Sequence, residues 1–77
     1  MAKAVAHALS GQWKDAHEIV QGDEGDELSC WLHAVLHHQE GDLPNAQYWY
    51  GRCGRRLRKA VKPEDELREI QAVLRAQ

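Results

Sequence analysis

Phenylalanine is absent from this chain of 77 residues, which also has only one methionine, two prolines and two cysteines. Two cysteines are too few for the disulfide scaffold of a small secreted domain. No run of about 18 apolar residues is present, so the sequence predicts no transmembrane helix. A formal net charge of −2 gives no overall attraction to nucleic acid or to a membrane surface.

The N-terminal stretch Met1–Leu9 contains too short an apolar run for a signal peptide, so we expect a cytoplasmic protein. A chain of this length forms one domain, 1–77, with a thin core, which disfavours an enzyme with a cleft between two lobes. The nucleophile-elbow, phosphate-loop and dinucleotide-binding motifs are all missing.

An internal repeat is visible when the sequence is shifted by 30 residues. The matched pairs are Val5 with Val35, His7 with His37, Gly11 with Gly41, and Ala16 with Ala46. Each unit has the pattern helix, glycine turn, helix, because glycine adopts the left-handed conformation that ends a helix. The small alanines that follow each turn allow the two helices of a unit to pack closely.

The apolar spacing predicts helices at 2–9, 13–21, 26–40 and from Leu43 to about Gly54, and a fifth helix that begins at Pro63. The third of these has the spacing of an amphipathic helix. We therefore predict an all-α fold of two helix-turn-helix, tetratricopeptide-like (TPR-like) repeats of about 30 residues. The expected divisions are repeat one at 2–25, repeat two at 26–54, a basic connector at 55–62 and a C-terminal capping helix at 63–77.

Two segments carry a more specific pattern. They are GQWKDAHEIVQ at 11–21 and WLHAVLHHQEGDLPNAQYWYGR at 31–52. The chain resembles a family of small uncharacterised bacterial TPR-like helical proteins with the pattern W-x-H-A-x-L-H-x-x-E-G-D-x-x-N-A-x-Y-W-Y-x-R. The resemblance covers about residues 11–56 and implies a helical, TPR-like protein, but it implies no known activity. His38 departs from the basic residue of the pattern, and Cys30 and Cys53 are not part of it.

His33 and His37 are four residues apart, so both imidazoles lie on one helix face about 6 Å apart. This spacing suits one metal ion, and Glu40 follows three residues later. The pair therefore offers a candidate metal or acid-base site, with zinc or another transition metal as its cofactor. The alternative is that both histidines are hydrogen-bonded residues of a helix interface, and no cofactor is then expected.

Cys30 and Cys53 lie at about the same distance from the turn at Asp42, so an antiparallel helix pair places them at one level. His33 could then join them in a metal site, whereas His37 is two helical turns away from Cys30. The alternative is that both cysteines are small buried hydrophobic residues. A disulfide fits this geometry but is not expected in the cytosol.

Tyr48, Trp49 and Tyr50 are consecutive, and successive helical residues point about 100° apart, so all three cannot face one core. We expect Trp49 inside and at least one tyrosine at the rim, where aromatic rings favour contact with a ligand or protein. The candidate binding surface comprises His33, His37, Tyr48, Tyr50 and Arg52. Alternatively, the tyrosine hydroxyls only satisfy polar groups between helices.

Charge is segregated along the chain, with six acidic residues between Asp15 and Glu27 and six basic residues between Arg52 and Lys62. No nucleic-acid-binding motif accompanies the basic stretch, so we expect pairing with the acidic segment or a solvated surface. Three functions stay open: a non-catalytic module for a protein, peptide or small ligand, a metal-dependent or acid-base site, and a homodimer or larger assembly. A non-catalytic role is favoured over an enzyme, and the question stays open, because so thin a core provides a water-excluding pocket only through dimerisation.

Overall fold

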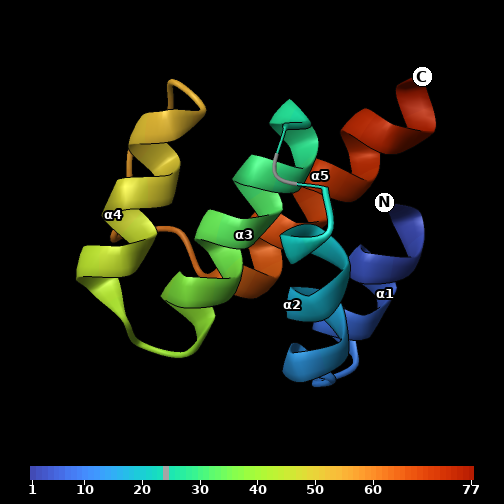
Figure 1. Cartoon of the computed structure of the whole chain (residues 1–77), viewed down its shortest axis with the longest axis horizontal. Coiled ribbons are helices and arrows are strands. Elements are labelled where there is room, and N and C mark those ends of the chain that lie inside the picture. The colour runs from blue at the N-terminus through green and yellow to red at the C-terminus, as the bar shows by residue number, and fades with distance from the viewer. Residues whose placement is uncertain (24) are drawn as a thin grey trace.

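Helices are the regular secondary structure throughout the part of the chain that the structure describes. The computed structural model describes residues 1–23 and 25–77, and these residues contain five helices and no strand (Figure 1). The helices are α1 (Ala2–Leu9), α2 (Trp13–Gln21), α3 (Glu27–Gln39), α4 (Leu43–Arg52) and α5 (Pro63–Ala76). The all-α prediction is confirmed, and the third and fourth helices are slightly shorter than their spacing predicted.

Helix α3 is the centre of the fold, because α2, α4 and α5 all pack against it. Nine of its thirteen residues are buried, in an unbroken run from Ser29 to His37. The amphipathic pattern predicted for this segment was therefore incomplete, since α3 is covered on nearly every side. A helix that is enclosed in this way has little polar face left, and its buried polar side chains need partners inside the protein.

The turns after α1 and α3 are built alike, 30 residues apart. Gly11 and Gly41 have φ angles of 80° and 87°, in the left-handed region that glycine adopts without a Cβ clash. The residue after each glycine returns a hydrogen bond to the helix. The backbone N–H of Gln12 donates to His7 at 2.8 Å, and that of Asp42 donates to His37 at 2.9 Å. These bonds satisfy carbonyls that the end of a helix leaves unpaired.

The two helices that each of these turns connects, α1 with α2 and α3 with α4, lie close together. Ala16 of α2 and Ala46 of α4 are fully buried, as expected for small residues where two helices cross. Asp42 accepts a hydrogen bond from the backbone N–H of Asn45 at 3.3 Å, which caps α4.

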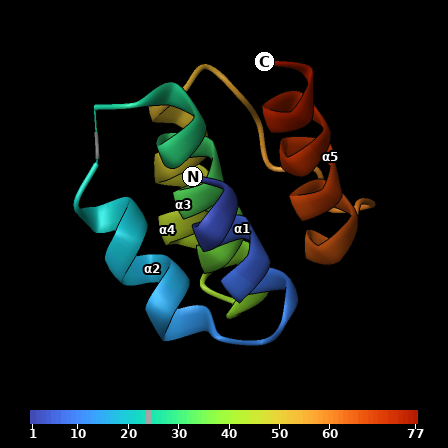
Figure 2. The ribbon, with the colours of Figure 1, turned by 90° about the vertical axis from the view of Figure 1, so that its right-hand side faces the viewer.

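Helix α5 lies to one side of α1 and α3 and packs on both of them (Figure 2). Its buried residues are Leu67 and Ile70, together with the carboxylate of Glu66. Glu66 accepts hydrogen bonds from the Trp31 indole at 2.8 Å and from the Tyr50 hydroxyl at 2.6 Å. This carboxylate joins α5 to both helices of the second hairpin.

The basic segment 55–62 contains turns but no helix. Two of its arginines contact the body of the protein instead of the acidic segment before α3. The Arg55 guanidinium lies 3.5 Å from the centre of the Trp31 ring, a cation–π contact. Arg58 pairs with Glu69 at 2.7 Å and approaches Glu66 at 3.5 Å, both on α5.

The five helices form a nearly isotropic body of 26 × 24 × 23 Å. Met1 and Gln77 line the same depression, so the two chain ends lie close together. Among the described residues, no helix combines the length and the apolar character that crossing a membrane requires.

Candidate metal centre

Three histidines from two helices converge beside the core. His17 comes from α2, and His33 and His37 come from successive turns of α3. One ring nitrogen from each histidine lies within 4.8 Å of the other two. The Nε2 atoms of His17 and His33 are hydrogen-bonded at 3.2 Å, so one ring donates its proton and the other accepts it.

Two tryptophans hold the histidine rings in place. Trp13 stacks on His17 with a centroid distance of 4.5 Å, and its indole N–H donates to the carbonyl of Leu36 at 2.6 Å. Trp49 stacks on His33 at 3.9 Å, with only 17° between the planes. Stacked rings on fixed indoles lose little conformational freedom when they coordinate an ion, so the histidine arrangement is preorganised.

Glu40 fixes the orientation of His37. Its carboxylate lies 2.6 Å from His37 Nδ1, which therefore donates its proton to this oxygen. In the neutral ring, Nε2 then carries the free lone pair. Metal-ligating histidines in proteins are commonly held by a carboxylate on the other ring nitrogen, as His37 is here.

His37, Glu40 and Asp42 also offer three ligand atoms within 4.8 Å of one another. In this second group, however, Asp42 already caps α4, and Glu40 already accepts from His37. The cluster formed by His17, His33 and His37, which we call the histidine cluster, therefore has the stronger ligand geometry.

Burial favours the uncharged form of two members of the histidine cluster, His17 and His33. It lowers the pKa of His33 to about 4, and the neighbouring His17 and His37 lower it further. Burial also lowers the pKa of His17, with His37 acting in the same direction and Glu40 against it. Only 3 % of the His33 surface is exposed. Near neutral pH both rings are deprotonated, the form in which imidazole binds metal.

The separation of the nitrogen atoms is compatible with a single ion. Two nitrogens bound 2.0–2.1 Å from a tetrahedral zinc ion lie about 3.3–3.4 Å apart. The His17 and His33 nitrogens are 3.2 Å apart before any ion is considered. A ring nitrogen of His37 lies within 4.8 Å of both ligand atoms, so this third ring must move closer for one ion to contact all three.

Of the five residues expected to form a binding surface, only Tyr48 and Arg52 are exposed, whereas His33, His37 and Tyr50 are buried. The Arg52 guanidinium lies 5.0 Å from the Trp49 ring on which His33 stacks. Tyr48 is 56 % exposed, and its hydroxyl accepts from Arg52 at 3.5 Å. Tyr50 is not part of this surface, because its ring is 1 % exposed and its hydroxyl points to Glu66.

As expected, Cys30 and Cys53 lie at the same level along the antiparallel pair α3 and α4. The thiols of Cys30 and Cys53 each donate to the carbonyl oxygen of Trp49, both at 3.4 Å. His33 does not join them, because its ring packs against His17, His37 and Trp49. The described structure therefore does not bring Cys30, Cys53 and His33 together in one site; the histidines and the thiols form two separate groups.

His17 is the member of the histidine cluster that the sequence did not predict. Its sequence context, with Gln21 four residues later, does not complete the zinc-protease helix motif H-E-x-x-H. A usable signal is its spacing of four residues from Trp13, which places an aromatic ring and an imidazole on one face of α2. That face meets α3 only once the two helices are packed, a relation that spacing within one helix does not contain.

In comparisons with known proteins, no family model, no curated protein and no solved structure matches this chain. The function is therefore inferred from the geometry of the chain itself.

Proposed function

We propose that this protein binds one divalent transition-metal ion, of the zinc class, through His17, His33 and His37. The observation that carries the proposal is the convergence of three ring nitrogens within 4.8 Å of one another. The carboxylate of Glu40 behind His37 supports it, because such a contact orients a ligating ring and raises its basicity.

The ligand chemistry selects the kind of ion. Three neutral imidazoles are borderline ligands that suit zinc, copper, nickel, cobalt or iron, whereas magnesium and calcium require oxygen ligands. The thiols of Cys30 and Cys53 donate to the Trp49 carbonyl instead of joining the cluster. We therefore expect an all-nitrogen protein ligand set.

Three protein ligands leave one position of a tetrahedral ion for water, a small anion or a group from a partner. His17 is only half-buried, so that position faces solvent on the α2 side of the cluster. An ion there would link α2 to α3 and stabilise the contact between the two hairpins.

The experiment that tests this function is a titration of the reduced, chelator-treated chain with Co²⁺ and Zn²⁺. Cobalt is the probe because its visible spectrum reports coordination number, and its near-ultraviolet region reports thiolate ligands. We expect one ion per chain, a spectrum of tetrahedral or five-coordinate nitrogen and oxygen ligands, no thiolate band, and a higher melting temperature with zinc.

The variants for this titration follow from the contacts. His17→Ala removes a half-buried ligand without opening the core, so we expect a folded chain that loses the cobalt spectrum. Glu40→Gln keeps all three ligands and should weaken binding by about 10- to 100-fold. His7→Ala is the matched control, because His7 contacts Gln12 and lies outside the histidine cluster. Binding that survives His17→Ala, or a spectrum with thiolate ligands, contradicts the proposal.

We also propose that the two hairpins α1–α2 and α3–α4 are TPR-like repeats, as the sequence predicts. The equivalent turns at Gly11 and Gly41, and the buried Ala16 and Ala46, support this architecture. Superposition of the two hairpins in an experimentally determined structure tests it, and hairpins with different helix crossings would contradict it.

A further inference from the structure

Two free thiols meet where the second hairpin ends. Cys30 lies in the first half of α3, and Cys53 directly follows α4. Both thiols donate to a single atom, the carbonyl oxygen of Trp49, at 3.4 Å each. The two sulfur atoms are therefore at most twice that distance apart, across two helices that are already packed together.

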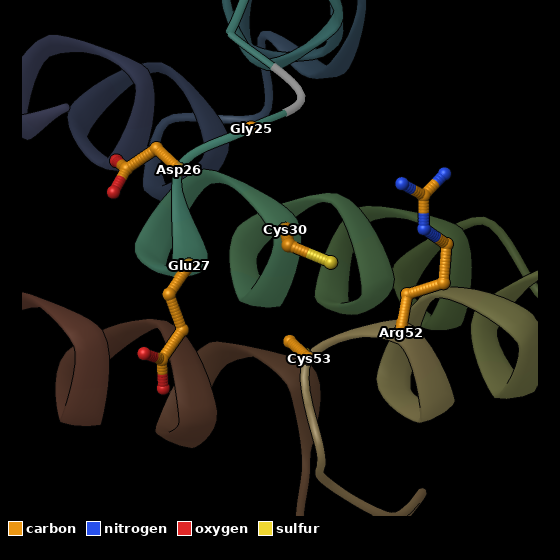
Figure 3. A pocket seen from close by; sticks show the side chains of 6 residues that line it. All are labelled: Gly25, Asp26, Glu27, Cys30, Arg52 and Cys53. Atoms are coloured by element: carbon orange, nitrogen blue, oxygen red, sulfur yellow. The ribbon is translucent and has the colours of Figure 1, made fainter.

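The thiols open onto a surface pocket of about 440 Å³ between the start of α3 and the end of α4. Figure 3 shows Cys30 and Cys53 at its centre, with Asp26 and Glu27 on one side and Arg52 on the other. Cys30 is 6 % exposed, whereas Cys53 is more accessible. Cys53 is thus the thiol that a reagent in solvent reaches first, and Cys30 is the more deeply buried thiol next to it.

We propose that Cys30 and Cys53 are a redox modification site, at which a low-molecular-weight disulfide such as oxidised glutathione converts the two thiols into an intramolecular disulfide. This proposal does not depend on metal binding, because neither thiol belongs to the histidine cluster.

The reaction is two successive thiol–disulfide exchanges. The Cys53 thiol loses its proton and its sulfur attacks one sulfur of the small disulfide. The S–S bond of the reagent breaks, a mixed disulfide forms, and one small thiol leaves with that proton. The Cys30 thiol then loses its proton and its sulfur attacks the Cys53 sulfur; the S–S bond of the mixed disulfide breaks, and the second small thiol leaves with that proton. Two cysteine thiols are oxidised, and one small disulfide is reduced to two thiols.

The surroundings make the first exchange slow near neutral pH. Burial raises the pKa of the Cys53 thiol to about 11, with Cys30 adding to the rise and Arg55 opposing it. The other charged groups around the pocket are Asp26, Glu27 and Arg52. Since the thiolate is the nucleophile, the rate should rise about tenfold per pH unit below this pKa. Accidental oxidation is thereby limited, while the short path to Cys30 favours completion once a mixed disulfide forms.

The test is incubation of the chelator-treated chain with oxidised glutathione at two pH values, followed by alkylation and intact-mass measurement. We expect a monomer that has lost two hydrogens, carries no glutathione and no alkyl group, and forms about tenfold faster per pH unit. Alkylation of both thiols after long incubation would overturn the proposal, as would a stable glutathione adduct or a cross-linked dimer.

Two serine variants assign the roles. Cys30→Ser retains the accessible thiol and should stop at the mixed disulfide. Cys53→Ser retains only the buried thiol and should react at least tenfold more slowly than Cys30→Ser. Equal rates in the two variants would contradict the assigned order of attack. Urea-unfolded wild-type chain is a further control, because without the helix contact it should accumulate mixed disulfides.

Discussion

Acid should destabilise this protein because His33 is held uncharged in the folded state. The pKa of His33 is about 4, against a normal value of 6.5, mainly because the ring is buried. The unfolded chain therefore binds a proton at His33 between pH 6.5 and pH 4, and the folded chain does not. Stability is greatest above pH 6.5, falls as the pH is lowered through this window, and levels off below pH 4.

The magnitude follows from the size of the shift. A difference of about 2.5 pKa units, at 1.36 kcal/mol per unit, gives a loss of roughly 3 kcal/mol by pH 4. About 2 kcal/mol of this is already lost at pH 5. For a domain of this size, such a loss is a large part of the free energy of unfolding.

The assay is urea unfolding of the chelator-treated chain at several pH values between 4 and 8. His33→Asn has a neutral side chain in both states, so its free energy of unfolding should fall less with acid by roughly 3 kcal/mol. His7→Gln, near the protein surface, should keep the wild-type slope. The reasoning is refuted if wild type and His33→Asn lose stability in parallel between pH 6.5 and pH 4.

Two further predictions concern the framework that holds the site. Glu66→Ala leaves the buried Trp31 indole and Tyr50 hydroxyl without an acceptor. At 1–3 kcal/mol per orphaned group, urea unfolding should show a free energy of unfolding lower by about 4 kcal/mol. Glu66→Gln keeps one acceptor oxygen and should lose less stability, and equal losses in the two variants would argue against this account. Gly41→Ala places a Cβ at a φ of 87° and should lower the free energy of unfolding by about 1–2 kcal/mol. Gly25→Ala, with open space and no positive φ, should lower it less. The opposite order would show that the left-handed conformation at Gly41 does not determine the cost of the substitution.

The helix boundaries were predictable because local residues set them. Gly11 and Gly41 end helices by adopting positive φ, and Pro63 begins one. The environment of α3 was not predictable from its own spacing. Its apolar stripe indicated one buried face, but α5 returns to cover a further side, and this contact depends on residues more than 30 positions away.

Glu66 illustrates the same limit. Among three acidic residues at the start of a helix, the helix dipole explains all of them equally well. Only Glu66 lies four residues before the buried Ile70, on the face that meets α3. Its buried carboxylate accepts from Trp31 and Tyr50, and neither partner is near it in sequence.

Two of the three members of the histidine cluster could be found in the sequence, because His33 and His37 are one helical turn apart. The third member, His17, depends on how α2 is rotated against α3, which the sequence of neither helix records. The turn of the hairpin alone predicted that Cys30 and Cys53 lie at one level, whereas it did not predict that His33 points to His17 and away from the thiols.

The hydrogen bond between His17 and His33 explains how a buried cluster can accept a cation. One Nε2 carries the shared proton and the other carries a lone pair, so both rings are satisfied without an ion. An ion needs lone pairs on both nitrogens, so the ring that donates must move its proton to Nδ1 or release it. Because burial holds both of these rings uncharged near neutral pH, an entering ion meets no imidazolium at His17 or His33. Its binding requires a change of tautomer in one ring, while the stacked tryptophans keep both rings in position.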